Sequence, residues 1–305
     1  HRHTNRIAEP MLRILAIALV MLGPTYSAFA QLASADHALL ETGGPAKPPP
    51  PVADSAPISI VTYNIRWRTG AELQRLGEWL KTKHPLVIAL QEVDRAKLRT
   101  NKTDNARTLA GELGMYYAWA APPLPQSSQE KEEETGVELL SPYPLSEVTR
   151  IVLPHEGPGG RWRVALGATV KIGKTEVRVY SVHAETRIPL DQKVEQFRAV
   201  LADLNKFAKS NPAIVMGDFN SWEPATVKKV RELFTAEKFA TPFSDDDPTF
   251  KRSAVIFDID LKLDWIWLRN LTAASSGIDR NLTVSDHFPL WAVAGQLPSS
   301  KSRQQ

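Results

Sequence analysis

The sequence predicts an α+β fold in which two mixed β-sheets pack together with helices on the outside. Strand-like segments outnumber helical ones, and many of them follow one another without a helix between them. A doubly wound parallel sheet needs a crossover helix between neighbouring strands, so this order argues against a purely βαβ architecture. Polar residues of catalytic type also recur where the strands end, which is typical of a sheet edge that carries a site.

The first half of the body mixes β-branched runs with helical periodicity. Residues 58–64 are β-branched and predict a strand, and residues 71–83 place Leu73, Leu76 and Leu80 at helical spacing. Pro85 ends that helix. The other expected elements are strands at 86–90, 115–119, 136–141 and 147–153, a helix at 104–114 and a polar loop at 121–135.

The second half contains the longest helical pattern. Residues 190–209 place Val194, Phe197 and Leu201 on one face of a helix. The other expected elements are strands at 164–171, 176–183, 213–216, 263–268 and 289–294, and a helix near 224–238.

The N-terminal segment has the pattern of a signal peptide. Met11 is the expected start, Arg13 supplies a positive end, and residues 14–22 are an apolar run broken by Gly23. The run is far shorter than the roughly 20 residues that a membrane-spanning helix needs. Residues 28–30 offer small residues for cleavage. We therefore expect residues 1–30 to direct secretion or periplasmic export, with a retained anchor or a buried helix as alternatives.

The remaining chain divides by composition. Residues 31–57 are rich in proline and predict an unstructured linker. Residues 58–298 form the expected catalytic domain, and residues 299–305 form a polar, disordered tail. We expect no transmembrane segment in the mature chain, and nothing in it indicates an obligate protein partner.

Composition excludes several protein classes. Hydrophobic residues make up 43% and charged residues 23% of the 305 residues, close to the average of soluble globular proteins. There is no cysteine, so a disulfide framework, a thiolate zinc site and a cysteine nucleophile are excluded. The net charge of +3 falls to +1 without residues 1–30, so overall charge gives little support to nucleic-acid binding.

Three of the polar residues at strand ends suit a hard cation. Glu92 and Asp286 offer carboxylate oxygens, and Asn64 is a neutral companion. Such a set favours Mg²⁺ or Mn²⁺, which prefer carboxylates, waters and phosphate oxygens. Each residue alone has a simpler explanation, because a solvated strand end also carries polar side chains.

Five further residues suit proton transfer. His183 and His287 could donate protons, and Asp264 could orient His287. Asp218 could activate water, with Asn220 holding a phosphoryl oxygen or positioning Asp218. Residues 217–220 could equally form an ordinary turn. A metal, a water-activating carboxylate and a proton donor together are what phosphoester hydrolysis requires.

Seven short motifs occur in an order that resembles a known superfamily. They are Thr62-Tyr63-Asn64-Ile65-Arg66, Leu90-Gln91-Glu92-Val93-Asp94, residues 136–141, Ser181-Val182-His183, Gly217-Asp218-Phe219-Asn220, Leu263-Asp264-Trp265-Ile266 and Ser285-Asp286-His287-Phe288-Pro289. Across residues 58–296 the chain resembles the endonuclease/exonuclease/phosphatase superfamily, the deoxyribonuclease I-like metal-dependent phosphohydrolases.

This resemblance implies a four-layer α/β/β/α sandwich and a role for each motif residue. Glu92, with Asn64 and Asp286 nearby, would hold the metal. Asp264 would pair with His287, and His183 would contact the scissile phosphate. Asp218 would activate or position the water, with Asn220 beside it. The number of metals and the identity of the general base stay open.

One residue departs from the family pattern. Glu138 stands where a small or apolar residue is usual in the motif at 136–141. We expect it to face solvent. The alternative is that it faces the site and partners His183 or a second cation. Residues 130–134 are expected to form a solvated loop, from which one Glu could orient His183.

Three arginines near the strand ends bear on the class of substrate. Arg66, Arg95 and Arg99 follow strand ends and are expected to rim the pocket and attract an anionic ester, although a solvated loop would carry such charges too. The expected substrate is a phosphodiester, such as a nucleic acid or a phospholipid headgroup. A phosphomonoesterase acting on inositol phosphates and a non-catalytic binding module are the alternatives.

Overall fold

The computed structural model describes residues 39–124, 134–253 and 258–296. From Leu40 onward these residues belong to one compact unit. The predicted signal peptide and the C-terminal tail lie outside the described residues. Within the described ranges, no helix is long and apolar enough to cross a membrane.

The larger sheet has seven strands in the order β1-β4-β5-β3-β2-β14-β13. Only β2 and β3 run parallel, and the other neighbours are antiparallel. Its strands are β1 (Leu40–Gly43), β2 (Ile58–Asn64), β3 (Val87–Arg95), β4 (Tyr116–Ala120), β5 (Glu134–Ser141), β13 (Leu271–Ile278) and β14 (Leu290–Gln296).

The smaller sheet has five strands in the order β12-β9-β8-β7-β6, in which only β8 and β9 run parallel. Its strands are β6 (Leu145–Val152), β7 (Val164–Ile172), β8 (Thr175–His183), β9 (Ala213–Asp218) and β12 (Asp264–Arg269). Two further strands, β10 (Phe250–Ser253) and β11 (Asp258–Leu261), pair only with each other.

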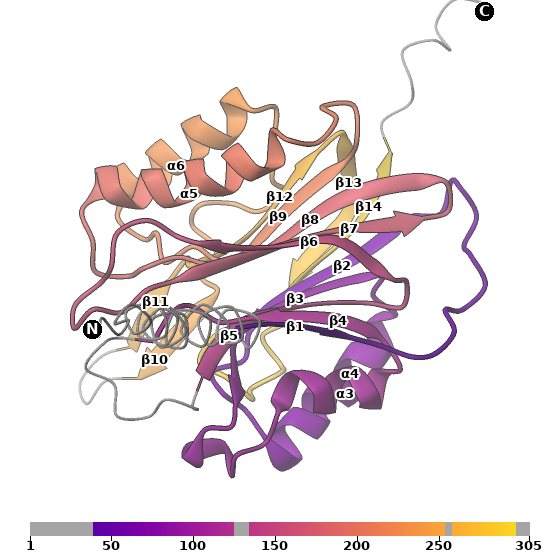
Figure 1. Ribbon diagram of the computed structural model, residues 1–305. Coiled ribbons are helices and arrows are strands. Elements are labelled where there is room, and N and C mark those ends of the chain that lie inside the picture. The colour runs from indigo at the N-terminus through magenta and orange to yellow at the C-terminus, as the bar shows by residue number, and fades with distance from the viewer. Residues whose placement is uncertain (1–38, 125–133, 254–257, 297–305) are drawn as a thin grey trace, which may run out of the picture. The chain divides into compact units, whose positions relative to one another are not determined.

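Helices cover both outer faces of this pair of sheets. α3 (Gly70–Lys83) and α4 (Asn105–Leu113) lie on the larger sheet, and α5 (Leu190–Leu204) and α6 (Pro224–Ala236) lie on the smaller one (Figure 1). A short 3₁₀ helix, η1, spans Leu98–Thr100. The α+β prediction and the four-layer sandwich are confirmed.

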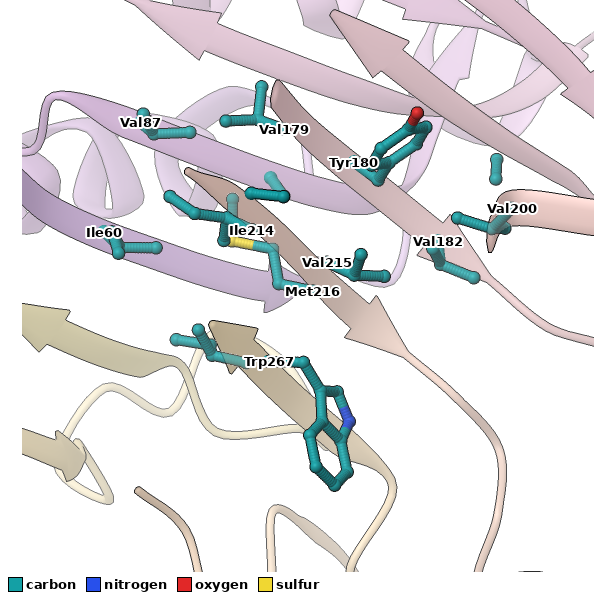
Figure 2. Close-up of a cluster of buried hydrophobic side chains, with 14 of the residues drawn as sticks. Ile60, Val87, Val179, Tyr180, Val182, Val200, Ile214, Val215, Met216 and Trp267 are labelled. Carbon is teal, nitrogen blue, oxygen red and sulfur yellow. The ribbon is translucent and has the colours of Figure 1, made fainter. Parts of the chain in front are cut away.

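Strand alternation explains why the two sheets pack face to face. Successive residues of a strand point to opposite faces. On β9, Ile214 therefore points toward the larger sheet, where Ile60 lies, while Val215 points toward Val200 of α5 (Figure 2). All four side chains are fully buried. The strand runs are apolar on both faces because each sheet is covered on both sides.

Four predicted boundaries or assignments are wrong. β1 lies inside the expected linker, where Glu41 accepts hydrogen bonds from Arg95 and Arg107 and so fixes the segment against β4. The helix expected at 190–209 ends at Leu204, after which the amide of Phe207 bonds to the carbonyl of Leu204 in a tighter turn. The hairpin of β10 and β11 and the strand β13 were not expected at all.

Glu138 does not face solvent, and it does not face the predicted site. Its side chain is fully buried on β5. It lies opposite Leu90 of β3 and Trp119 of β4, on the face that α3 and α4 cover. Neither carboxyl oxygen has a hydrogen-bond partner. Burial, reinforced by the charge of Asp104, raises the pKa of Glu138 well above its usual value.

Replacing this carboxyl by a thioether should stabilise the protein in a pH-dependent way. The pKa of Glu138 is raised in the folded state, whereas the unfolded state ionises above pH ~4.3. The folded state therefore binds the proton more tightly, and wild-type stability falls as pH rises above that value. Glu138→Met should therefore raise the free energy of unfolding by ~2 kcal/mol at pH 8, and by less at pH 4. Urea unfolding at both pH values measures the two differences. An equal gain at both would contradict the assignment.

Candidate active site

The site forms where strand ends of the two sheets meet. Asn64 ends β2, and His183 and Asp218 end the parallel pair β8 and β9, in which they are register partners. Asp264 begins β12 opposite Asp218. The Nδ2 of Asn64 donates to Oδ2 of Asp218 at 2.9 Å, so one hydrogen bond joins the two sheets at this end.

A β-bulge directs Glu92 into the site. The register of β3 against β5 shifts between Gln91 and Val93, and Glu92 has a φ of 55°. Gln91 is fixed in the core by donating to the hydroxyl of Ser181. The bulge turns the Glu92 side chain away from the core and into the site, where Nδ2 of Asn64 donates to its Oε1 at 3.2 Å.

The backbone around Asp218 is held very close to β8. A Cβ on Gly217, whose φ is 136°, would lie 2.1 Å from the carbonyl oxygen of Val182, so only glycine fits there. The backbone N–H of Asn220 donates to Oδ1 of Asp218 at 3.0 Å. The side-chain Nδ2 of Asn220 donates to the carbonyl of Ala184 at 3.1 Å. Burial raises the pKa of Asp218 to about 7.

His287 is paired with a buried carboxylate. Its Nδ1 donates to Oδ2 of Asp264 at 2.8 Å, and its Nε2 lies 3.8 Å from Oδ2 of Asp218. Burial alone would lower the pKa of His287, but the charges of Asp264 and Asp218 outweigh burial and raise it to about 10. His287 is therefore an imidazolium at neutral pH.

His183 has the opposite environment. Its Nε2 lies 3.6 Å from Oδ2 of Asp218 and 3.9 Å from Oε1 of Glu92. Its Nδ1 lies 3.3 Å from the guanidinium of Arg163. Burial and the charge of Arg163 lower the pKa of His183 well below its usual value. The two histidines therefore flank Asp218 in different protonation states.

These groups open into one cleft of about 310 Å³. Asp286 lies on its wall and pairs with Arg66, another lining residue, at 2.8 Å. Asn64 and Asp264 lie behind the wall. The cleft is lined by Arg66, Trp67, Glu92, Arg163, His183, Thr186, Asp218, Asn220, Trp222, Phe250, Arg252, Leu261, Leu263, Asp286 and His287.

Arg95 and Arg99 are not part of this cleft wall. Arg95 donates to Glu134 and Glu41, and Arg99 binds Asp94 through Nε at 2.7 Å and Nη2 at 2.8 Å. Both guanidinium groups thus fix loops and strands around β3. Glu134 is also buried in β5 and not in a solvated loop, while residues 130–133 lie outside the described residues.

The donor set of the cleft fits a hard divalent cation. The side chains of Glu92 and Asp286 are 23% and 17% exposed and both line the cleft, so their carboxylates can reach a ligand there. Asn64 was expected among the metal ligands, but its Oδ1 accepts the amide of Arg66 and its Nδ2 holds the carboxylates of Glu92 and Asp218. It is therefore placed to position the carboxylates.

A second cluster of possible metal ligands lies nearby and consists of two aspartates and a histidine. Oxygen or nitrogen atoms of Asp218, Asp264 and His287 all lie within 4.8 Å of one another. The imidazolium of His287, hydrogen-bonded to Asp264, cannot offer a lone pair from Nδ1. Glu92 and Asp286 are therefore the better candidates for a metal.

Sequence reasoning missed several cleft residues. Arg163 lies beside His183 and is held by the buried Glu185, which is not part of the cleft lining, and Arg252 and Phe250 reach the cleft from the hairpin of β10 and β11. The only signal in the sequence is proximity, since Glu185 follows His183 by two positions. Arg163 is 20 positions before His183 and meets it only through the register of β7 and β8.

Residues 61–287 match the family model described as Endonuclease/Exonuclease/phosphatase family. Similar solved structures include an endonuclease/exonuclease/phosphatase from Beutenbergia cavernae, with 18% identity and a TM-score of 0.63 over 79% of this chain and 72% of that one. The human nocturnin catalytic domain with bound sulfate shows 20% identity and a TM-score of 0.63, over 83% and 100%. ANGEL2, a 2′,3′-cyclic phosphatase, shows 14% identity and a TM-score of 0.61, over 80% and 96%. No curated protein matches the sequence significantly.

Proposed function

Because the chain belongs to the endonuclease/exonuclease/phosphatase family, whose members are phosphoester hydrolases, we propose that it is an exported, Mg²⁺- or Mn²⁺-dependent phosphodiesterase. The observation that carries the proposal is the position of Asp218 between two histidines, at 3.6 Å from His183 and 3.8 Å from His287. A carboxylate held between two such groups is suited to accept a proton from water while the histidines contact phosphoryl oxygens.

Each residue has a separate task in this proposal. A divalent cation held by Glu92 and Asp286 would supply positive charge to a phosphoryl oxygen. Asp218 takes the proton of the attacking water, since its raised pKa makes the carboxylate a stronger base. The water oxygen bonds to phosphorus, the phosphorus–oxygen bond to the leaving group breaks, and the leaving oxygen takes up a proton from solvent. His287 stays protonated through Asp264 and stabilises the negative charge that develops on the phosphate.

The charge of the cleft favours a diester over a monoester. A monoester at neutral pH carries about one more negative charge than a diester and needs more free cations around it. Three arginines line the cleft, but Arg66 is paired with Asp286 and Arg163 with Glu185. Only Arg252, among the described arginines of the lining, has no such ion pair. A monoesterase remains the alternative on this fold, and a binding module would not need the Asp264–His287 pair.

The side chains around the polar centre also suit a diester. Trp67, Trp222 and Phe250 line the cleft from three different loops or strands. They offer apolar surfaces for the two groups that flank a phosphodiester. The fold shared with ANGEL2, a 2′,3′-cyclic phosphatase, supports testing a cyclic diester as well as linear ones.

A substrate panel tests this proposal. The purified protein is assayed with bis(4-nitrophenyl) phosphate, 4-nitrophenyl phosphate, plasmid DNA, RNA, a 2′,3′-cyclic nucleotide and a phospholipid diester, with Mg²⁺, Mn²⁺ or chelator. We expect metal-dependent cleavage of at least one diester at roughly 10-fold or more above the monoester, since charge excess disfavours the latter. Asp264→Asn controls for contaminating activity. A preference for the monoester would contradict the proposal.

A further inference from the structure

The two histidines of the cleft have opposite partners on their second ring nitrogen. Nδ1 of His287 is hydrogen-bonded to a carboxylate, with Oδ2 of Asp264 at 2.8 Å. Nδ1 of His183 is instead next to a guanidinium, with Nη1 of Arg163 at 3.3 Å. Arg163 directly precedes β7, and Val164 is the register partner of His183, so the strand pairing itself puts Arg163 there.

A guanidinium determines which nitrogen of the histidine carries the proton. Arginine has only N–H donors and cannot accept a hydrogen bond. Nδ1 of His183 must therefore accept from Arg163, and the single ring proton must be on Nε2. That nitrogen faces Asp218 and Glu92, at 3.6 and 3.9 Å, on the cleft side of the ring.

Glu185 holds Arg163 in this orientation. Its carboxylate is completely buried and accepts from Nε of Arg163 at 3.1 Å and from Nε of Arg161 at 3.0 Å. It also accepts from the backbone amides of Thr186 at 2.8 Å and Arg187 at 3.1 Å. Burial opposes ionisation, but these donors outweigh it and lower the pKa of Glu185 to about 2. The carboxylate thus remains ionised and keeps Arg163 charged and fixed.

We propose that Arg163 is a positioning residue that holds His183 as the Nε2–H tautomer, so that His183 acts as a neutral hydrogen-bond donor to a substrate oxygen. The tautomer follows from the hydrogen bonds of this chain alone, whereas the substrate contact rests on the proposed function. The cleft then combines an imidazolium, His287, with a neutral imidazole, His183, and the Nε2 atoms of both lie near Oδ2 of Asp218.

The spectroscopic test needs no substrate. Long-range ¹H–¹⁵N correlation spectra of the metal-free protein report the tautomer of each histidine, and His183→Gln identifies the signals of His183. We expect the Nε2–H pattern in the wild type. Arg163→Met should lose it, and Arg163→Lys, which can still donate to Nδ1, should restore much of it. Arg231→Met, at an arginine outside the cleft, is the matched control and should change nothing.

A second experiment tests the donor role of His183 by measuring the turnover of a substrate that the wild type cleaves. Glutamine can place an N–H near the Nε2 position, whereas asparagine places its amide nearer Nδ1. His183→Gln should therefore be at least 10-fold more active than His183→Asn and His183→Ala. Circular dichroism confirms that each variant is folded.

The two experiments fail separately. An Nδ1–H or doubly protonated His183 in the wild type, or an unchanged pattern in folded Arg163→Met, would overturn the tautomer assignment. Equal loss of activity in His183→Gln and His183→Ala would overturn the donor role. Absence of all phosphoester hydrolysis would count against the proposed function, and the spectra would still decide the tautomer.

Discussion

Asp218→Asn is expected to lower the turnover of a phosphodiester by roughly 10³-fold or more. Asparagine keeps the size of the side chain and can still accept the amide of Asn220, but it cannot take a proton from water. It also leaves His287 without one of its two carboxylate neighbours. Initial rates at saturating substrate measure the loss.

An exposed aspartate supplies the matched control for this variant. Asp246→Asn makes the same change outside the cleft and should leave turnover within twofold of the wild type, on the order expected for a surface substitution. Circular dichroism and thermal melting show whether Asp218→Asn is folded. A folded Asp218→Asn protein with more than a tenth of wild-type turnover would remove Asp218 from the proposed chemistry.

Glu92→Gln is expected to raise the Mg²⁺ concentration needed for half-maximal activity by roughly 10-fold to 100-fold. Glu92 is a partly exposed carboxylate on the cleft wall, held by Asn64. Removing its charge weakens a hard-cation site, because an amide oxygen is a poorer ligand than a carboxylate. Titration of activity with Mg²⁺ measures the shift, and calorimetric titration of Mg²⁺ alone measures binding without substrate.

The matched control lies at the far end of a site strand. Glu176→Gln changes an exposed glutamate near the start of β8, the strand whose last residue is His183. It should leave the Mg²⁺ dependence unchanged. The metal assignment would fail if Glu92→Gln bound Mg²⁺ as tightly as the wild type.

The sequence predicted the residues whose position depends on their own strand. Asn64, His183 and Asp218 each end a strand with a clear apolar run, so their convergence at one end of the sheets could be expected. Asp264 and His287 were predicted as a pair by the family resemblance, and their side chains are hydrogen-bonded.

The features that were missed depend on contacts between distant segments. In β5 the polar Glu138 lies between the apolar Val137 and Leu139, and this alternation predicts that the Glu138 face of the strand is exposed to solvent. In the structure α3 and α4 cover that face of the sheet. The hairpin of β10 and β11 belongs to neither large sheet, and each of its strands has only four residues with mostly exposed side chains, so its strand signal in the sequence is short and weak. Arg95 and Arg99 have carboxylate partners that no local pattern identifies.

One measurement tests most directly whether this cleft is a metal-dependent phosphodiesterase site. Hydrolysis of bis(4-nitrophenyl) phosphate is followed for the wild type and His287→Ala, first with chelator and then with Mg²⁺ restored. We expect chelator to abolish wild-type turnover, Mg²⁺ to restore it, and the folded variant to stay roughly 10²-fold or more below the wild type. Turnover that resists chelator, or that is equal in His287→Ala and the wild type, would contradict this assignment.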